Sequence, residues 1–186
     1  EQFIYWACKA RDGYAGAGTW IKTAMGVLQE LGVCPEPIWP YNADGIANNE
    51  GQGPPPAEAS AAASPNRIVS FTQLNATWVD SLRTALAAGS PVAFSVHVFA
   101  SCQRPHTYRG GDLRLPLPNE PTLGGHAMCM VGYVDDLSVP GGGYFIVRNS
   151  WGEAFGYDGE VAGGYCRLPY EYLRQYGIEA YTAEMV

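Results

Sequence analysis

The residues best suited to chemistry are His126 and Asn149, which lie in two apolar runs separated by a polar, glycine-rich break. The runs read HAMCMVGYV and YFIVRN, and the break spans residues 135–142. This is the pattern of two antiparallel strands joined by a hairpin loop. With the loop centred near Ser138, the hairpin brings His126 beside Asn149, at the roughly 5 Å spacing of neighbouring side chains on a paired ladder. Both runs are apolar at successive residues, so we expect both faces of the sheet to be covered.

A histidine beside an asparagine is typical of a base whose ring orientation is fixed. The amide oxygen of Asn149 accepts the proton on one ring nitrogen, which leaves the other nitrogen facing a nucleophile. Trp151, two residues on, would cover this hydrogen bond and keep water from it. A neutral amide suits a thiol partner, because the imidazolium formed when the thiol loses its proton is stabilised chiefly by the thiolate. The residues alone leave a second interpretation open, in which His126 is a satisfied core histidine and NSWG is merely a turn.

Three segments resemble the C-terminal half of the papain family of cysteine peptidases, and they read GGHAMCMVGYV, GYFIVRNSWGEAFG and GGYCRLPYEYL. The YRGG run at 108–111 resembles a YxGG segment of the family, and EQFIYWACKA with GVCPEPIWPY resembles the stretch that follows its catalytic helix. The resemblance implies an endopeptidase or exopeptidase that hydrolyses peptide bonds through a Cys-His-Asn site. It implies His126 and Asn149 as catalytic residues, Trp151 as their support, a peptide or protein as substrate, and no cofactor.

The nucleophile that the resemblance requires has no counterpart among the five cysteines. In the papain family this cysteine lies at the N-terminus of a long helix, where the helix dipole and the histidine lower the thiol pKa. The CWAF-like run of that helix is absent, and the first residues already read as the inside of a helix. We therefore expect a C-terminal portion whose catalytic cysteine lies upstream or on a second chain. Two alternatives stay open: a catalytically inactive papain-like protein that binds peptides or partners, and another Cys-His chemistry such as acyl transfer.

The resemblance implies an α+β, papain-like fold in which the N-terminal catalytic helix is missing. Residues 1–66 would form an incomplete helical subdomain, and residues 67–186 a barrel-like antiparallel β subdomain that carries His126 and Asn149. Periodicity predicts helices over 1–10, 19–31 and 77–88 and strands over 67–74 and 91–99. The stretch 51–66, GQGPPPAEASAAASPN, is low in complexity and is predicted to be a mobile surface excursion.

Glycines near the start of the chain and before His126 are the candidate substrate contacts. The segment DGYAGAG resembles a glycine-rich stretch whose backbone pairs with an extended substrate in papain relatives, which implies that role for Gly16 and Gly18. Gly125, directly before His126, is a further candidate. The alternative is that these glycines simply permit a tight turn.

Composition excludes several classes of partner. With 11 basic and 18 acidic residues, the 186-residue chain has a net charge of -7, which argues against a nucleic acid. No run approaches the ~20 apolar residues of a membrane span. The cysteines form no CxxC pair, so no metal site is predicted.

Overall fold

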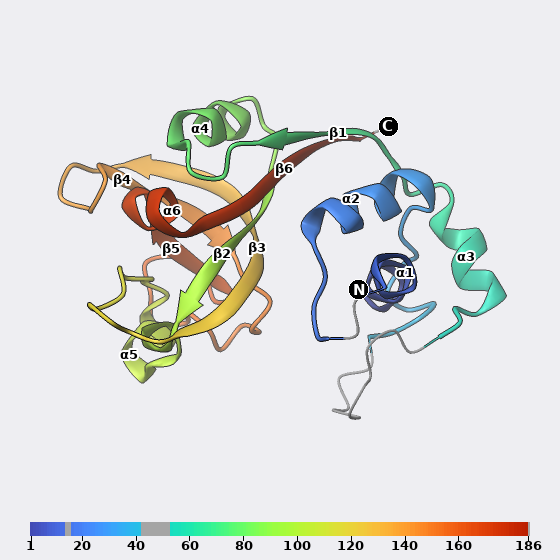
Figure 1. Cartoon of the computed structure of the whole chain (residues 1–186), viewed down its shortest axis with the longest axis horizontal. Helices are drawn as coiled ribbons and strands as arrows, with labels where there is room; N and C mark the ends of the chain where they lie inside the picture. The colour runs from blue at the N-terminus through green and yellow to red at the C-terminus, as the bar shows by residue number, and fades with distance from the viewer. Residues whose placement is uncertain (14–15, 42–52, 186) are drawn as a thin grey trace. The chain divides into compact units, whose positions relative to one another are not determined.

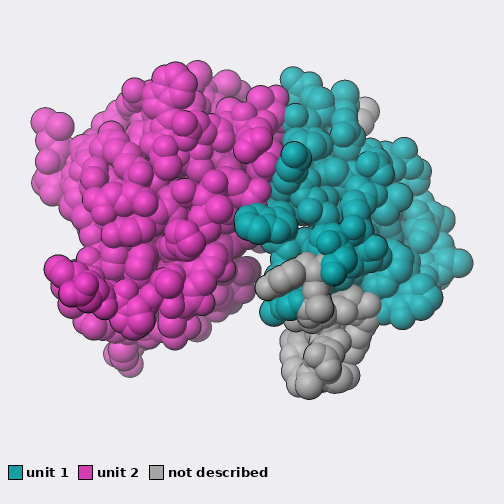
Figure 2. All heavy atoms as spheres, viewed as in Figure 1, with its two compact units in different colours: residues 1–71, 183–186 teal, residues 72–182 magenta. Residues whose placement is uncertain are grey.

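The computed structural model describes residues 1–13, 16–41 and 53–185, and its element order gives an α+β protein (Figure 1). The predicted fold class is confirmed. The chain divides into two compact units, which Figure 2 draws in teal and magenta. Unit 1 is Glu1–Phe71 with the last residues from Ala183, and unit 2 is Thr72–Thr182.

Unit 1 is built on helices, with α1 at Gln2–Asp12, α2 at Ile21–Glu30 and α3 at Ala57–Ala63. Phe3 and Ala7 of α1 are one turn apart and both buried, as the helical spacing requires. Ala7 lies in one apolar cluster with Val27 of α2, so these two helices share a core. Gly13 caps the C-terminus of α1, and its φ of 63° is the left-handed conformation that glycine adopts without strain. The helices predicted over 1–10 and 19–31 are thus present.

The α3 helix corrects the expectation for the stretch 51–66. Ala59 and Ala63 are fully buried and pack in one cluster with Phe3 and Cys34. Alanine has the highest helix propensity, and its single methyl group lets a short helix approach its neighbours closely. The alanine-rich part of the stretch is therefore packed structure and not a mobile excursion, while residues 51–52 lie outside the described residues.

The six-stranded sheet has the strand order β1-β6-β2-β3-β4-β5, and most of it belongs to unit 2, although the start of β1 and the end of β6 belong to unit 1. The pairs of β2 with β3 and β6, of β3 with β4, and of β4 with β5 are antiparallel. The strands are β1 Ile68–Leu74, β2 Val92–Phe99, β3 Thr122–Asp135, β4 Gly143–Arg148, β5 Tyr165–Pro169 and β6 Gly177–Met185. The strands predicted over 67–74 and 91–99 and the hairpin of β3 with β4 are present.

Helices α4, Val79–Ala87, and α6, Tyr170–Tyr176, pack against this sheet. Helix α4 contacts β2 and β3, and α6 contacts β2, β4 and β5 as well as α4. Their side chains Leu82 and Leu173 are fully buried in the core of the unit. On β3, however, Val131 is 45% exposed although Met130 is fully buried. The expectation that both faces of the hairpin are covered is therefore wrong for this part of β3.

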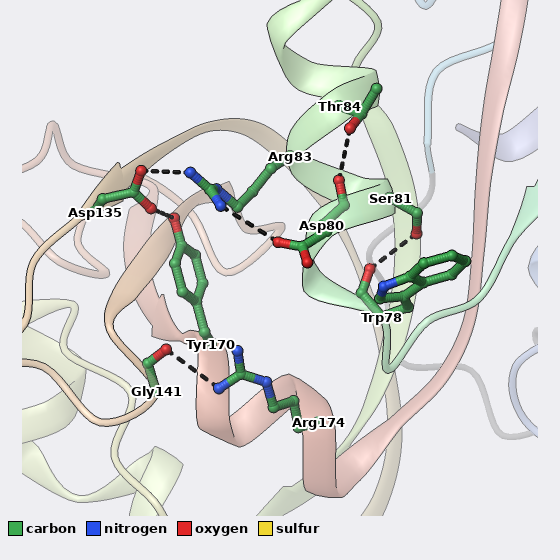
Figure 3. Close-up of polar contacts among 9 residues, drawn as sticks. All are labelled: Trp78, Asp80, Ser81, Arg83, Thr84, Asp135, Gly141, Tyr170 and Arg174. Carbon is green, nitrogen blue, oxygen red and sulfur yellow. Dashed lines mark hydrogen bonds and ion pairs between the residues drawn. The ribbon is translucent and has the colours of Figure 1, made fainter.

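The closed end of the β3–β4 hairpin is fixed to both helices (Figure 3). Arg83 of α4 forms an ion pair with Asp135, the last residue of β3. The hydroxyl of Tyr170 in α6 donates to the other carboxylate oxygen of Asp135 at 3.0 Å. Arg174 of α6 donates to the carbonyl oxygen of Gly141 in the hairpin loop at 3.2 Å. These contacts anchor the end of β3 and the hairpin loop to α4 and α6. A short 3-10 helix at Ala100–Gln103 and helix α5 at Pro105–Gly110 complete the unit.

Candidate active site

His126 and Asn149 meet at the open end of the hairpin. Nε2 of His126 lies 2.8 Å from Oδ1 of Asn149, and both side chains are half-buried. The predicted contact between the two side chains is thus present. Their chemical roles remain predictions.

The hydrogen bonds around Asn149 determine which nitrogen of His126 carries a proton. The backbone N–H of Ser150 donates to Asn149 Oδ1 at 2.8 Å, which identifies this atom as the amide oxygen. An amide oxygen only accepts, so Nε2 of His126 must be the donor of the 2.8 Å bond. In the neutral imidazole the other nitrogen, Nδ1, then carries a lone pair. The hydrogen bond to Asn149 therefore uses Nε2 and leaves the lone pair on Nδ1.

The pairing register differs in detail from the one expected. A bulge between Met130 and Gly132 shifts the ladder, and the last pair is Cys129 with Arg148. Asn149 lies beyond this last pair, and its backbone N–H donates to the carbonyl oxygen of Gly164 at 2.9 Å. The asparagine side chain reaches His126 because the chain leaves the ladder at this point, and not because the two residues face each other across it.

Trp151 stacks on the imidazole of His126. The ring centroids are 4.9 Å apart and the planes differ by 28°. Trp151 in turn meets Phe155 edge to face at 5.2 Å, and Phe155 is fully buried and contacts the ring of Tyr108 at 5.5 Å. The imidazole therefore has an apolar cover that is itself supported from the core.

The YRGG run supplies this support, a role that its resemblance to a family segment did not specify. The carbonyl oxygen of Tyr108 accepts from the N–H of Gly156 at 2.7 Å, which joins α5 to the segment after Trp151. Gly111 has a φ of 65°, and a Cβ there would lie 2.8 Å from the carbonyl oxygen of Tyr165. Only glycine permits this close approach of three backbone segments. In the sequence, only the glycines of YRGG indicate that backbone segments approach closely here.

The candidate substrate glycines lie in both units. Gly125 of β3 is exposed and pairs with His97 of β2. Gly16 and Gly18 belong to unit 1, where the carbonyl oxygens of both accept from Nζ of Lys9, at 2.8 and 3.2 Å. Their predicted role in binding substrate remains a prediction.

The three cysteines of unit 2 are poorly suited to act as nucleophiles. Cys166 is fully buried, and burial, with smaller effects of Cys102 and Asp112, raises its pKa to about 12. Burial also raises the pKa of Cys129, whose Sγ contacts the carbonyl oxygen of Met130. Cys102 is 1% exposed, and its Sγ lies 3.7 Å from the hydroxyl of Tyr172. Among the described residues, no cysteine sulfur forms a hydrogen bond with His126.

The two cysteines of unit 1 have the same character. Cys8 is fully buried, and burial raises its pKa to about 11 against the smaller opposing effect of the Thr19 hydroxyl. Burial likewise raises the pKa of Cys34. A nucleophilic thiol requires the opposite shift, toward a stable thiolate. Lys9 and Arg11 near Cys8, and the N-terminus near Cys34, favour the thiolate, but their effect is smaller than that of burial.

Within 1–13, 16–41 and 53–185, no group of three or more His, Cys, Asp or Glu side chains could hold a metal ion. In the same part of the chain, no helix combines the length and the apolar character needed to cross a bilayer.

Comparisons with known proteins agree on one family. The family model described as papain family cysteine protease matches residues 4–185. An uncharacterized peptidase C1-like protein of Acanthamoeba polyphaga mimivirus is 29% identical over 164 residues, which cover 84% of this chain and 48% of that protein. The chain thus spans about half the length of this curated relative.

Solved structures give the same result. Xylellain, a cysteine protease from Xylella fastidiosa, matches with a TM-score of 0.79 at 29% identity, covering 100% of this chain and 69% of that one. Digestive procathepsin L 3 of the Tenebrio molitor larval midgut matches with a TM-score of 0.70 at 24% identity, covering 98% of this chain and 54% of that one. At this lower identity the second likeness shows the fold alone.

Proposed function

The chain belongs to the papain family of cysteine proteases, and from this premise we propose that it supplies the histidine and asparagine of a Cys-His-Asn peptidase. The observation that carries the proposal is the 2.8 Å hydrogen bond between Nε2 of His126 and Oδ1 of Asn149. It fixes the neutral tautomer in which Nδ1 is free to take a proton. A protein that only binds peptides has no physical need for this arrangement.

Each residue of the proposed site has a distinct role. Nδ1 of His126 takes the proton of the thiol, and the thiolate attacks the scissile carbonyl carbon. The imidazolium returns the proton to the leaving amine, and water then hydrolyses the acyl-enzyme with His126 again as base. Asn149 accepts from Nε2 throughout and holds the ring in place. Trp151, stacked at 4.9 Å, excludes water that would compete for this hydrogen bond.

We further propose that the nucleophilic thiol is supplied from outside these 186 residues, in the same polypeptide or on a second chain. The support is the character of the five cysteines, of which Cys8, Cys34, Cys129 and Cys166 have pKa values raised by burial. We call this chain, together with the segment or chain that supplies the thiol, the complete protein. The substrate of the complete protein is a peptide or protein bound in extended form, with Gly16, Gly18 and Gly125 as contacts, and the complete protein acts as an endopeptidase or an exopeptidase.

Labelling with a peptide epoxide tests where the nucleophile lies. We expect the 186-residue chain alone to show no rapid labelling at neutral pH, because its buried thiols carry little thiolate. The complete protein should be labelled once, at a thiol outside this chain, and His126→Ala should prevent the labelling. Mass spectrometry of the digested product identifies the modified residue.

Each other outcome of this experiment points elsewhere. Stoichiometric labelling of one of the five cysteines, blocked by His126→Ala, would show that the nucleophile is in this chain. A complete protein that binds the parent peptide but is neither labelled nor hydrolytic would support the alternative, a catalytically inactive papain-like protein.

The cover over the imidazole gives a second test. In the complete protein, Trp151→Ala should lower kcat/KM by about 10-fold, because water then competes for a hydrogen bond that the burial had protected. Tyr157→Ala is the matched control, since Tyr157 is a 54% exposed aromatic residue of the same segment. It should leave kcat/KM within twofold of the parent. Equal losses in the two variants would argue that the stack on His126 has no special role. Steady-state kinetics with one fluorogenic peptide measure both variants.

A further inference from the structure

Arg167 of β5 forms ion pairs with two acidic residues from different segments. Its Nε donates to Oδ1 of Asp112 at 2.5 Å and its Nη2 to Oδ2 at 2.8 Å, which makes this a bidentate pair. Its Nη1 donates to Glu160. The guanidinium also lies over the ring of Tyr144, 5.4 Å from the ring centroid. The side chains of Arg167 and Asp112 are only 23% and 31% exposed, so solvent screens their pairing less than it would at an open surface.

The backbone fixes Arg167 and Asp112 relative to each other. The N–H of Arg167 donates to the carbonyl oxygen of Gly111 at 2.8 Å, and the N–H of Leu113 donates to the carbonyl oxygen of Arg167 at 3.0 Å. Asp112 thus lies between two backbone hydrogen bonds to the same residue of β5. Arg167 therefore has a fixed position, from which its remaining donor holds Glu160.

Glu160 belongs to the segment 152–164, which connects Trp151 to β5 and consists largely of turns and bends. Glu153 and Asp158 lie in this segment too, but within the described part of the chain its only ion pair is that of Glu160 with Arg167. Glu160 is 75% exposed, and so exposed a pair adds little to overall stability. Its main consequence is therefore the position that it gives to the segment.

The segment ends at the candidate active site. The carbonyl oxygen of Gly164 accepts from the N–H of Asn149 at 2.9 Å, and the N–H of Gly164 donates to the carbonyl oxygen of Phe155 at 2.7 Å. Phe155 in turn meets the ring of Trp151 at 5.2 Å. Asn149 lies beyond the last pair of β3 with β4, where the ladder does not fix its backbone. A shift of the segment that carries Glu160 would therefore move Asn149.

We propose that Arg167 is a positioning residue for the hydrogen bond between His126 and Asn149. It holds Glu160 against β5, and the segment that carries Glu160 holds the backbone of Asn149 through Gly164. The proposal rests on the proposed peptidase function. Because Asn149 orients the base for proton transfer, a misplaced Asn149 slows the chemical step without weakening the binding of substrate. The effect of Arg167 should therefore appear in kcat and not in KM.

The test is kinetic and uses the complete protein. Arg167→Met keeps an unbranched side chain but removes the charge and all its donors. We expect kcat to fall roughly 5- to 10-fold with KM within about twofold of the parent, the effect of one weakened hydrogen bond. Arg114→Met is the matched control, because Arg114 is an exposed arginine of the same unit whose guanidinium contacts the ring of His106. Its kcat and KM should not change.

A double-mutant cycle distinguishes positioning from general damage. If Arg167 acts through Asn149, Arg167→Met should change kcat by less than about twofold when it is added to Asn149→Ala. Damage that acts elsewhere would instead multiply the two losses. Glu160→Gln, which removes only the exposed charge, should show the same pattern with a smaller fall, roughly 2- to 3-fold. It carries the test if Arg167→Met does not fold.

The possible failures are separable. A complete protein without peptidase activity would overturn the proposed function and this inference with it. An active enzyme in which Arg167→Met and Glu160→Gln lower the melting temperature but leave kcat unchanged would overturn only the inference. The same holds if either substitution lowers kcat as much in Asn149→Ala as in the parent.

Discussion

Replacing His126 by alanine in the complete protein should lower kcat/KM for a peptide substrate roughly 100- to 10,000-fold, the usual contribution of a positioned general base. The substitution removes the group that accepts the thiol proton and later returns it to the leaving amine. The expectation rests on the 2.8 Å bond from Nε2 to Asn149, which leaves Nδ1 as the proton acceptor. Steady-state hydrolysis of a fluorogenic peptide measures the loss.

Asn149→Ala should have a smaller effect, roughly 10- to 100-fold, because Asn149 orients the ring and transfers no proton. His106→Ala is a suitable control. His106 is exposed, and its Nε2 lies 3.0 Å from a guanidinium nitrogen of Arg114. It should retain full activity. If His126→Ala hydrolyses the peptide as fast as the parent, the assignment of the base is wrong, whatever the result for Asn149.

The contact between His126 and Asn149 was predictable from the sequence because it depends on local pattern. Two apolar runs with a glycine-rich break specify a hairpin, and a hairpin brings its open ends together. The bulge between Met130 and Gly132 was not predictable, since it depends on how β3 packs and not on any turn residue. The contact forms although the predicted register was wrong, because Asn149 lies beyond the last pair of the ladder, where a side chain is not restricted to one face of the sheet.

The surroundings of the pair were harder to predict because they depend on tertiary packing. Trp151 could be placed near His126 because it lies two residues after Asn149. The rings of Phe155 and Tyr108 that support it come from segments some 40 residues apart, and sequence pattern does not show that these segments meet. The apolar pattern of β3 similarly suggested burial on both faces, yet Val131 is 45% exposed. An apolar run indicates which residues tolerate burial, but the tertiary packing determines which of them are covered.

The anchoring of the segment 16–18 shows a different limit. A lysine at position 9 reads as a surface residue, since lysine is almost never buried without a partner. The side chain of Lys9 is nevertheless buried, because its ammonium group donates to the backbone carbonyls of Gly16 and Gly18. The sequence does not show where such backbone acceptors lie. The glycines drew attention to this segment, whose role in binding substrate stays a prediction, but the contacts that anchor it required the structure.

Helix α3 provides the second large expected effect, which concerns stability. Ala59→Asp should lower the free energy of unfolding of unit 1 by about 3 kcal/mol or more, because it places a carboxylate without a partner in a packed apolar cluster. Ala59 is fully buried there with Phe3, Cys34 and Ala63. Ala59 is the third residue of the helix, where the helix dipole favours an acidic side chain, so any effect of the dipole opposes the predicted loss.

Ala61→Asp is the matched control, since Ala61 is an exposed alanine of the same helix. It changes the same side chain and should cost only about 0.5 kcal/mol, the difference in helix propensity. Hydrogen exchange of α1 and α3 measures the opening of this cluster separately from unit 2. In Ala59→Asp both helices should exchange faster and α3 should become sensitive to limited proteolysis, whereas in the parent and in Ala61→Asp α3 should resist cleavage. Equal exchange rates in the two variants would show that the packing of this alanine-rich stretch against Phe3 contributes no stability. Early cleavage within α3 of the parent would show that the stretch is a mobile excursion.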